Sequence, residues 1–184
     1  TLEKTRRIVA SCGNKVVAIT ADLTSETGRQ AVIDQTLKAF GKVDILINLA
    51  GMMSFTDFTV EDPYMTELLY KVNVLAPMQL TQTILPHMME RGQGQIVNIG
   101  SIFGSIAFAY FATYSSTKFA LRGFSEALRR ELQGTGVKVT YVAPRAAKTP
   151  FNSGAINKMS DAVKMNMDSP AIVANHIARA IEKD

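Results

Sequence analysis

Short, continuous apolar runs alternate along the chain with longer segments in which apolar residues recur every three or four positions. An apolar run without alternation predicts a strand buried on both faces, and the three-to-four spacing predicts an amphipathic helix. The predicted strands are 16–20, 43–49, 95–99 and 137–143. The predicted helices are 2–12, 26–40, 66–91, 113–133 and 170–183.

Residues at the predicted helix ends support these boundaries. Ser25 is placed to cap the start of the second helix, and Pro170 suits the first turn of the last helix. Gly41, Gly92 and Gly134 follow three of the helices, at positions where glycine commonly ends a helix.

The order of these elements indicates a fold class. Strands that alternate with helices of this length favour right-handed βαβ units, which build an α/β fold with a three-layer, doubly wound parallel sheet. No internal repeat, linker or low-complexity segment divides the sequence. We therefore expect residues 1–184 to form a single domain.

Composition excludes several classes of protein. With 47% hydrophobic residues the chain can bury a core, and its net charge of +4 is scattered, which argues against a nucleic-acid partner. The single cysteine, Cys12, is expected to be buried and fits a reducing compartment. The longest near-apolar run, 102–112, is too short to span a membrane. His87 and His176 lie near no cluster with ligand spacing, so we expect no metal site.

In an open parallel sheet, ligands bind beyond the carboxyl ends of the strands. The residues that follow the predicted strands are Asp22, 48–51, 100–101 and 144–149. Functional side chains are therefore expected along this edge of the sheet.

Four polar side chains and one small residue stand out near that edge. Tyr114 and Lys118 are four positions apart on a predicted helix, which places them on one face. Ser101 directly follows a strand, and Asn73 is a polar amide within an apolar helical stretch, which suggests a specific hydrogen-bonding task. Gly51 ends a turn of small residues whose backbone a ligand can approach.

These segments resemble the motifs of the short-chain dehydrogenase/reductase family in their order and spacing, over nearly the whole chain. They are Asp22-Leu23-Thr24, Asn48-Leu49-Ala50-Gly51, Lys71-Val72-Asn73, Ile96-Val97-Asn98-Ile99-Gly100-Ser101, Tyr114-Ser115-Ser116-Thr117-Lys118 and 144–149. The resemblance implies a Rossmann-like fold that binds NAD or NADP. It also implies that the family's first strand–helix–strand portion and last strand are absent from residues 1–184, so both NAD and NADP remain possible.

The resemblance implies a catalytic role for four residues. Tyr114 would be the general acid in reduction and the general base in oxidation, and Lys118 would lower the pKa of its phenol and bind the nicotinamide ribose. Ser101 would hold the substrate oxygen, and Asn73 would anchor a water that connects Lys118 to solvent. For Asn73, a helix-bending or core-satisfying amide is the alternative.

The resemblance also implies a cofactor site. Asp22 would contact the adenine, with a turn carboxylate as the alternative, and Leu23 would offer its backbone. Ala147 would present backbone to the nicotinamide, and Thr149 would hydrogen-bond the cofactor. The other implied cofactor-binding residues are Leu49, Ala50, Gly51, Tyr114, Lys118 and Pro144.

Two positions depart from the family pattern. Leu49 stands where an asparagine is usual, so only backbone contact to the adenosine would persist. Arg145 stands where a glycine is usual, and its side chain would narrow the pocket or attract an anionic group.

The implied substrate walls, 102–111 and the irregular segment 151–167, are strongly apolar. They favour a hydrophobic ketone or secondary alcohol, with Ser101, Phe103, Tyr114 and Phe151 as substrate-binding residues. A homodimer or homotetramer and a cytoplasmic location are expected from the same resemblance. The alternatives are a non-catalytic nucleotide-binding or scaffolding relative and an isomerase or epimerase with the same residues.

Overall fold

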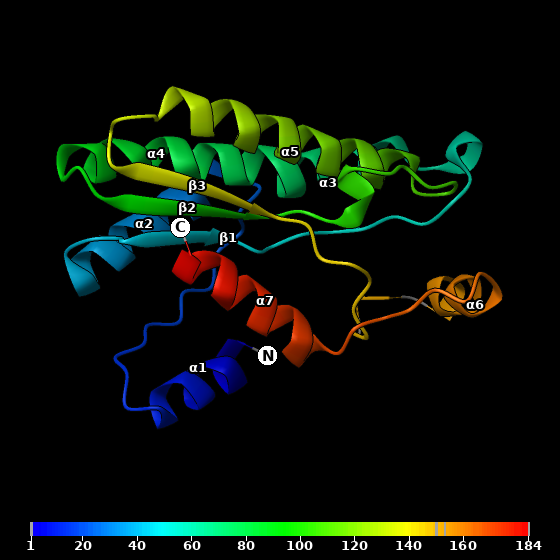
Figure 1. Cartoon of the computed structure of the whole chain (residues 1–184), viewed down its shortest axis with the longest axis horizontal. Helices are drawn as coiled ribbons and strands as arrows, with labels where there is room; N and C mark the ends of the chain where they lie inside the picture. Colours follow the sequence, from blue (N-terminus) through cyan, green and yellow to red (C-terminus); the bar gives the residue numbers. More distant parts are fainter. Residues whose placement is uncertain (1, 150, 153, 184) are drawn as a thin grey trace.

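A three-stranded parallel sheet forms the centre of the fold (Figure 1). The computed structural model describes residues 2–149, 151–152 and 154–183. The strands β1 (Ile45–Asn48), β2 (Gly94–Ile99) and β3 (Val137–Val142) lie in the order β1-β2-β3, and all pairs are parallel. The carboxyl ends of the three strands therefore meet at one edge, as predicted.

Helices cover both faces of this sheet. In Figure 1, α4 (Ala76–Glu90) and α5 (Ala112–Glu131) lie above the sheet and α7 (Pro170–Lys183) lies below it. The helix α2 (Glu26–Phe40) contacts α4 and adds to the same core. The buried residues of this core are Ile33, Leu80, Ile84, Met88, Ile96, Leu128, Leu132, Val137 and Val139. The prediction of a layered α/β fold with a parallel sheet is confirmed.

The predicted helix at 66–91 is longer and contains a widened turn. It begins as α3 (Pro63–Tyr70), which Asp62 caps by accepting a hydrogen bond from the amide of Tyr64. A π-helical turn (Lys71–Leu75) then leads directly into α4. Such turns are frequent at functional sites because the extra residue redirects a side chain. Here the turn contains Asn73, which is 1% exposed.

Two segments differ in secondary structure from the prediction. Residues 16–20 are not a strand: they pair with no strand of the described chain, and none of them is buried. A β-branched run has the propensity for a strand, but the strand itself needs a neighbour to form its hydrogen-bond ladder. The segment expected to be irregular, 151–167, contains the helix α6 (Gly154–Ala162).

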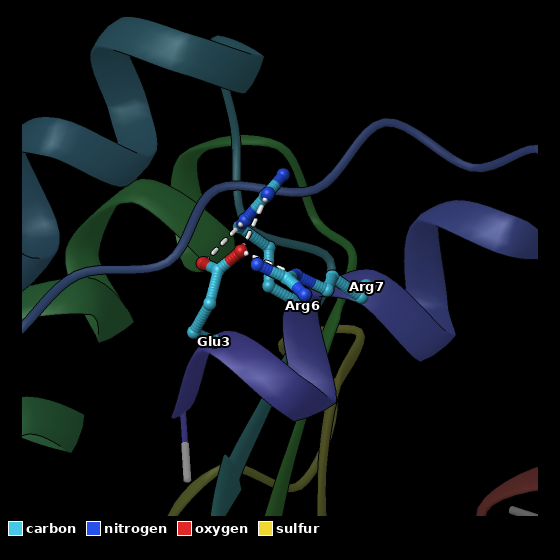
Figure 2. A network of polar contacts seen from close by, with 3 residues as sticks. All are labelled: Glu3, Arg6 and Arg7. Carbon is cyan, nitrogen blue, oxygen red and sulfur yellow. Dashed lines mark hydrogen bonds and ion pairs between the residues drawn. The ribbon is translucent and has the colours of Figure 1, made fainter.

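The first helix, α1 (Leu2–Ser11), is held by charged side chains rather than by burial. Glu3 accepts hydrogen bonds from Arg6 and Arg7 at 2.8–3.0 Å, as Figure 2 shows, and no residue of the helix is buried. Cys12, which follows it, is exposed, so its predicted burial is wrong. Among the described helices, none combines the length and apolar character that crossing a bilayer requires.

Candidate active site

A cavity of about 640 Å³ opens where the carboxyl ends of the strands meet. This volume is within the usual range of small-molecule and cofactor sites. Most of the predicted site residues line it: Leu49, Gly51, Ser101, Phe103, Tyr114, Lys118, Pro144, Ala147, Thr149 and Phe151. Asp22, Leu23, Ala50 and Asn73 do not line this cavity.

Tyr114 and Lys118 share one buried face of α5. Each residue is 6% exposed, and the Nζ atom of Lys118 lies 5.7 Å from the centre of the Tyr114 ring. Lys118 also donates a hydrogen bond of 3.2 Å to the carbonyl of Ile99, at the end of β2. Burial lowers the pKa of Lys118 to about 8, because the apolar surroundings disfavour its charged form.

The phenol of Tyr114 responds to the same surroundings. Burial raises its pKa, and an interaction with the Ser101 hydroxyl opposes this in part. The expected lowering of the phenol pKa by Lys118 is therefore wrong for this structure. Desolvation of the buried phenol is the largest cause of the shift, and its direction is the reverse of the one expected from Lys118.

Ser101 is held at the start of a short helical turn (Ile102–Gly104). Its hydroxyl accepts a hydrogen bond from the amide of Phe103 at 3.2 Å. Gly100 packs directly against the ring of Tyr141, where a side chain on Gly100 would clash. Tyr141 is not among the site residues that the sequence predicts. Its position near the end of β3 is the signal that could have indicated it.

Asn73 uses its amide to join two parts of the site. Its Oδ1 accepts from the amide of Met52, and its Nδ2 donates to the carbonyl of Met52, both at 2.8 Å. Nδ2 also donates to the Thr117 hydroxyl at 3.0 Å, which in turn donates to the carbonyl of Tyr114 at 2.7 Å. Both amide protons are thus engaged. Asn73 ties the loop after β1 to the helix that carries Tyr114, and the water-anchoring role stays a prediction.

A second buried network was missed by the sequence reasoning. Asn48 and Asn98 are register partners on β1 and β2, and the Asn48 amide donates to Oδ1 of Asn98 at 2.8 Å. Asn98 donates in turn to Ser125 on α5 at 2.9 Å. Polar residues inside otherwise apolar strands were the available signal. These bonds fix the strand ends beneath the cavity.

Asp22 forms a turn of its own. Its carboxylate accepts hydrogen bonds from the amide and the hydroxyl of Thr24 at 2.9 and 2.8 Å, and these bonds lower its pKa. The structure thus shows the turn carboxylate that was the alternative at this position. Leu23 and Ala50 line a second, smaller cavity of about 240 Å³, and Leu49 borders both cavities.

Arg145 is paired across the cavity rim. Its guanidinium donates two-pronged hydrogen bonds to the carboxylate of Asp168 at 2.9–3.2 Å. The backbone of Asp168 also bonds to Ala146 and Lys148, which joins the segment after β3 to the start of α7. The charge of Arg145 is therefore largely neutralised within the chain.

Comparisons with known proteins agree with this geometry. A family model described as short chain dehydrogenase matches residues 1–178. The ketoacyl reductase HetN of Nostoc sp. (strain PCC 7120) is 33% identical over 98% of this chain and 63% of its own length. The human dehydrogenase/reductase SDR family member 7 is 37% identical over 78% of this chain and 44% of its own length. The chain thus spans less than two thirds of these two relatives.

Solved structures show the same fold. A short-chain dehydrogenase from Streptomyces avermitilis superposes with a TM-score of 0.86 at 31% identity, covering 99% of this chain and 72% of that one. A short-chain dehydrogenase/reductase from Caenorhabditis elegans, solved with cofactor, has a TM-score of 0.84 at 28% identity, covering 96% of this chain and 73% of that one.

Proposed function

The chain belongs to the short-chain dehydrogenase/reductase family, and we propose that it transfers hydride between NAD or NADP and a hydrophobic ketone or secondary alcohol. In this proposal Tyr114 is the general acid in reduction and the general base in oxidation. The observation that carries the proposal is the buried Tyr114–Lys118 pair on the wall of the cavity, with Ser101 beside it.

The residues at the inner end of the cavity fit a nicotinamide cofactor. A Cβ on Gly51 would lie 3.4 Å from Oδ1 of Asn73 and 3.8 Å from Nζ of Lys118, so its absence keeps the backbone accessible beside the lysine. Among the described residues, Lys118 spends one N–H donor on Ile99, which leaves donors for ribose hydroxyls. Ala147 and Thr149 line the same cavity. When bound, the cofactor supplies or accepts the hydride.

The chain's own residues would handle the proton. Because burial raises the pKa of Tyr114, the phenol holds its proton at neutral pH and is ready to donate it to a carbonyl oxygen. The Ser101 hydroxyl, which interacts with Tyr114, would hold that oxygen in line. The raised pKa works against the base role, which oxidation requires of the same phenol.

The lining supports an uncharged, apolar substrate. Among the described residues that line the cavity, only Lys118 and Arg145 carry a charge, and Arg145 is paired with Asp168. Unbranched methionine side chains adapt to the shape of a ligand. The apolar side chains beyond Ser101 include Met53, Ile102, Phe103, Phe111, Phe151, Ile156, Met159, Met165 and Met167.

We also propose that exposed apolar residues on α5 and on the π-turn–α4 segment pair two copies of the chain. Leu75 is 43% exposed, Met78 36% and Phe119 43%, and the π-helical turn contacts α5, so these side chains offer apolar surface on adjacent elements. Light scattering of the purified protein tests this proposal: a dimer or tetramer supports it, and a monomer at all concentrations contradicts it.

The test of the enzymatic proposal is turnover by the purified protein with NADH or NADPH. A panel of aliphatic and aromatic ketones is compared with small sugars. Tyr114→Phe is expected to reduce turnover by about 10²-fold or more while cofactor fluorescence still reports binding. Tyr110→Phe is the matched control, because Tyr110 is 55% exposed and does not line the cavity. Turnover confined to sugars, or equal turnover in wild type and Tyr114→Phe, would contradict the proposal.

A further inference from the structure

The helix that carries Tyr114 begins without a capping side chain of its own. Phe111 occupies the position before α5 and makes no side-chain cap hydrogen bond. Instead Oε2 of Glu61, from a distant loop, accepts a hydrogen bond from the hydroxyl of Thr113 in the first turn. A carboxylate near a helix N-terminus is stabilised by the helix dipole.

Glu61 lies between the short helical turn 58–60 and the start of α3. Its amide donates to the carbonyl of Phe58 at 3.4 Å, and it directly precedes Asp62, the cap of α3. Its second carboxylate oxygen, Oε1, is buried and has no hydrogen-bond partner among the described residues. Leaving a carboxylate oxygen buried and unpaired costs free energy, so its place in the structure calls for an explanation. Glu61 does not line either cavity described above, so substrate contact does not account for it.

Three bonds tie the segment 61–73 to one side of α5. Glu61 bonds to Thr113, the hydroxyl of Tyr70 donates to Ser116 at 3.0 Å, and Asn73 donates to Thr117 at 3.0 Å. Tyr114 and Lys118 line the cavity instead. Since these contacts flank the residues that line the cavity, they set the rotation of the helix.

We propose that Glu61 is a positioning residue, which acts through Thr113 to fix the first turn of α5 and thereby the place of Tyr114. The inference rests on the proposed function of Tyr114 for its effect on catalysis. Helix ends fray, and the bond from Glu61 is the one nearest the start of the helix. Loss of the bond between Glu61 and Thr113 lets water reach the phenol of Tyr114. If the bond had a merely structural role, its loss would lower stability and leave the pKa of Tyr114 unchanged.

The experiment compares Glu61→Ala and Glu61→Gln with Glu67→Ala, an exposed carboxylate of α3 that pairs with Lys71. The tyrosinate absorbance of each protein is titrated, and that of the same protein carrying Tyr114→Phe is subtracted, which isolates Tyr114. In Glu61→Ala the pKa of Tyr114 is expected to fall towards the ordinary value for tyrosine, and kcat to fall about tenfold with little change in KM. Glu61→Gln keeps an acceptor oxygen and is expected to restore both.

The inference is overturned if Glu61→Ala leaves the titration of Tyr114 and kcat unchanged, whatever its melting temperature. It is also overturned if Glu61→Gln is as impaired as Glu61→Ala. If Glu61→Ala does not fold, Thr113→Val removes the donor at similar volume and decides in the same way. The titration needs no substrate. Absence of turnover in the wild type would therefore count against the proposed function, while the titration still decides the role of Glu61.

Discussion

The Nζ atom of Lys118 lies 5.7 Å from the centre of the Tyr114 ring, in surroundings that leave each residue 6% exposed. Burial favours the neutral form of both groups, so it lowers the pKa of the lysine and raises that of the phenol. Near neutral pH the pair is thus a neutral phenol beside an ammonium that loses its proton more readily than that of an ordinary lysine. Their shared desolvation has a measurable consequence for stability.

Replacing Lys118 by Met is expected to change how stability depends on pH. The pKa of Lys118 is about 8 in the folded protein and 10.5 ordinarily, so the unfolded chain binds more protons between these values and wild-type stability rises with pH there. Below pH 8 the buried charge costs about 3 kcal/mol at 1.36 kcal/mol per pKa unit. Denaturant unfolding should show the free-energy difference between Lys118→Met and wild type shrinking by this amount from pH 7 to pH 10.5.

The comparison cancels groups that titrate alike in both proteins. Because Lys118 lies beside the Tyr114 ring, both proteins carry Tyr114→Phe in this measurement, which removes the phenol's own titration. Any constant cost from the lost hydrogen bond to Ile99 shifts the whole curve without changing its slope. A difference that stays the same from pH 7 to pH 10.5 would show that burial does not depress the lysine's pKa.

Asn73→Ala is expected to destabilise the fold by about 3 kcal/mol, because it removes three hydrogen bonds. Two of them join Asn73 to the backbone of Met52, and the third joins it to Thr117. In a chain of this size such a destabilisation corresponds to a fall in melting temperature of about 10 °C. Asn175→Ala, an exposed substitution on α7, is the control and should change the melting temperature little. Similar melting temperatures for the two variants would contradict the tethering role.

Local sequence patterns were enough to predict several residues of this site. The spacing of Tyr114 and Lys118 is a property of one helix, and Ser101 follows from the end of one strand, so sequence alone placed both at the cavity. The bond from Asn73 to Met52 joins residues of different elements, and no periodicity reveals it. The direction of the Tyr114 pKa was also beyond the sequence, because desolvation depends on everything packed around the phenol.

The fold shows the same division between local and long-range information. The helix ends at Ser25 and Gly41 were predictable, because capping depends on neighbouring residues: Ser25 accepts from the amide of Gly28, and Gly41 has a φ of 77°. The absence of a strand at 16–20 was not predictable from its composition, because strand pairing depends on a partner elsewhere.

Gly51→Ala is expected to weaken cofactor binding without unfolding the protein. The added Cβ would sit in ordinary contact with Asn73 and Lys118, at the edge of the cavity, so we expect KM for the cofactor to rise about tenfold and stability to change by less than about 1 kcal/mol. Gly123→Ala on α5 is the matched control. A Cβ there meets nothing within 4 Å, and the variant should keep its KM and gain up to about 1 kcal/mol of helix stability. Equal KM values in both variants would exclude close cofactor approach at Gly51.

Asp168→Asn is expected to change which substrates the site accepts. In the wild type the carboxylate of Asp168 pairs with Arg145, whose guanidinium lines the cavity rim. Removing that charge leaves a cation beside the substrate, and an exposed pair of opposite charges is worth up to about 1 kcal/mol. The ratio of kcat/KM for a keto acid to that for its uncharged methyl ester should therefore rise about threefold to fivefold, and less at high salt. Asp161→Asn on α6 provides the control for a lost surface carboxylate. If both variants keep the wild-type ratio, the pairing of Arg145 does not govern the preference for uncharged substrates.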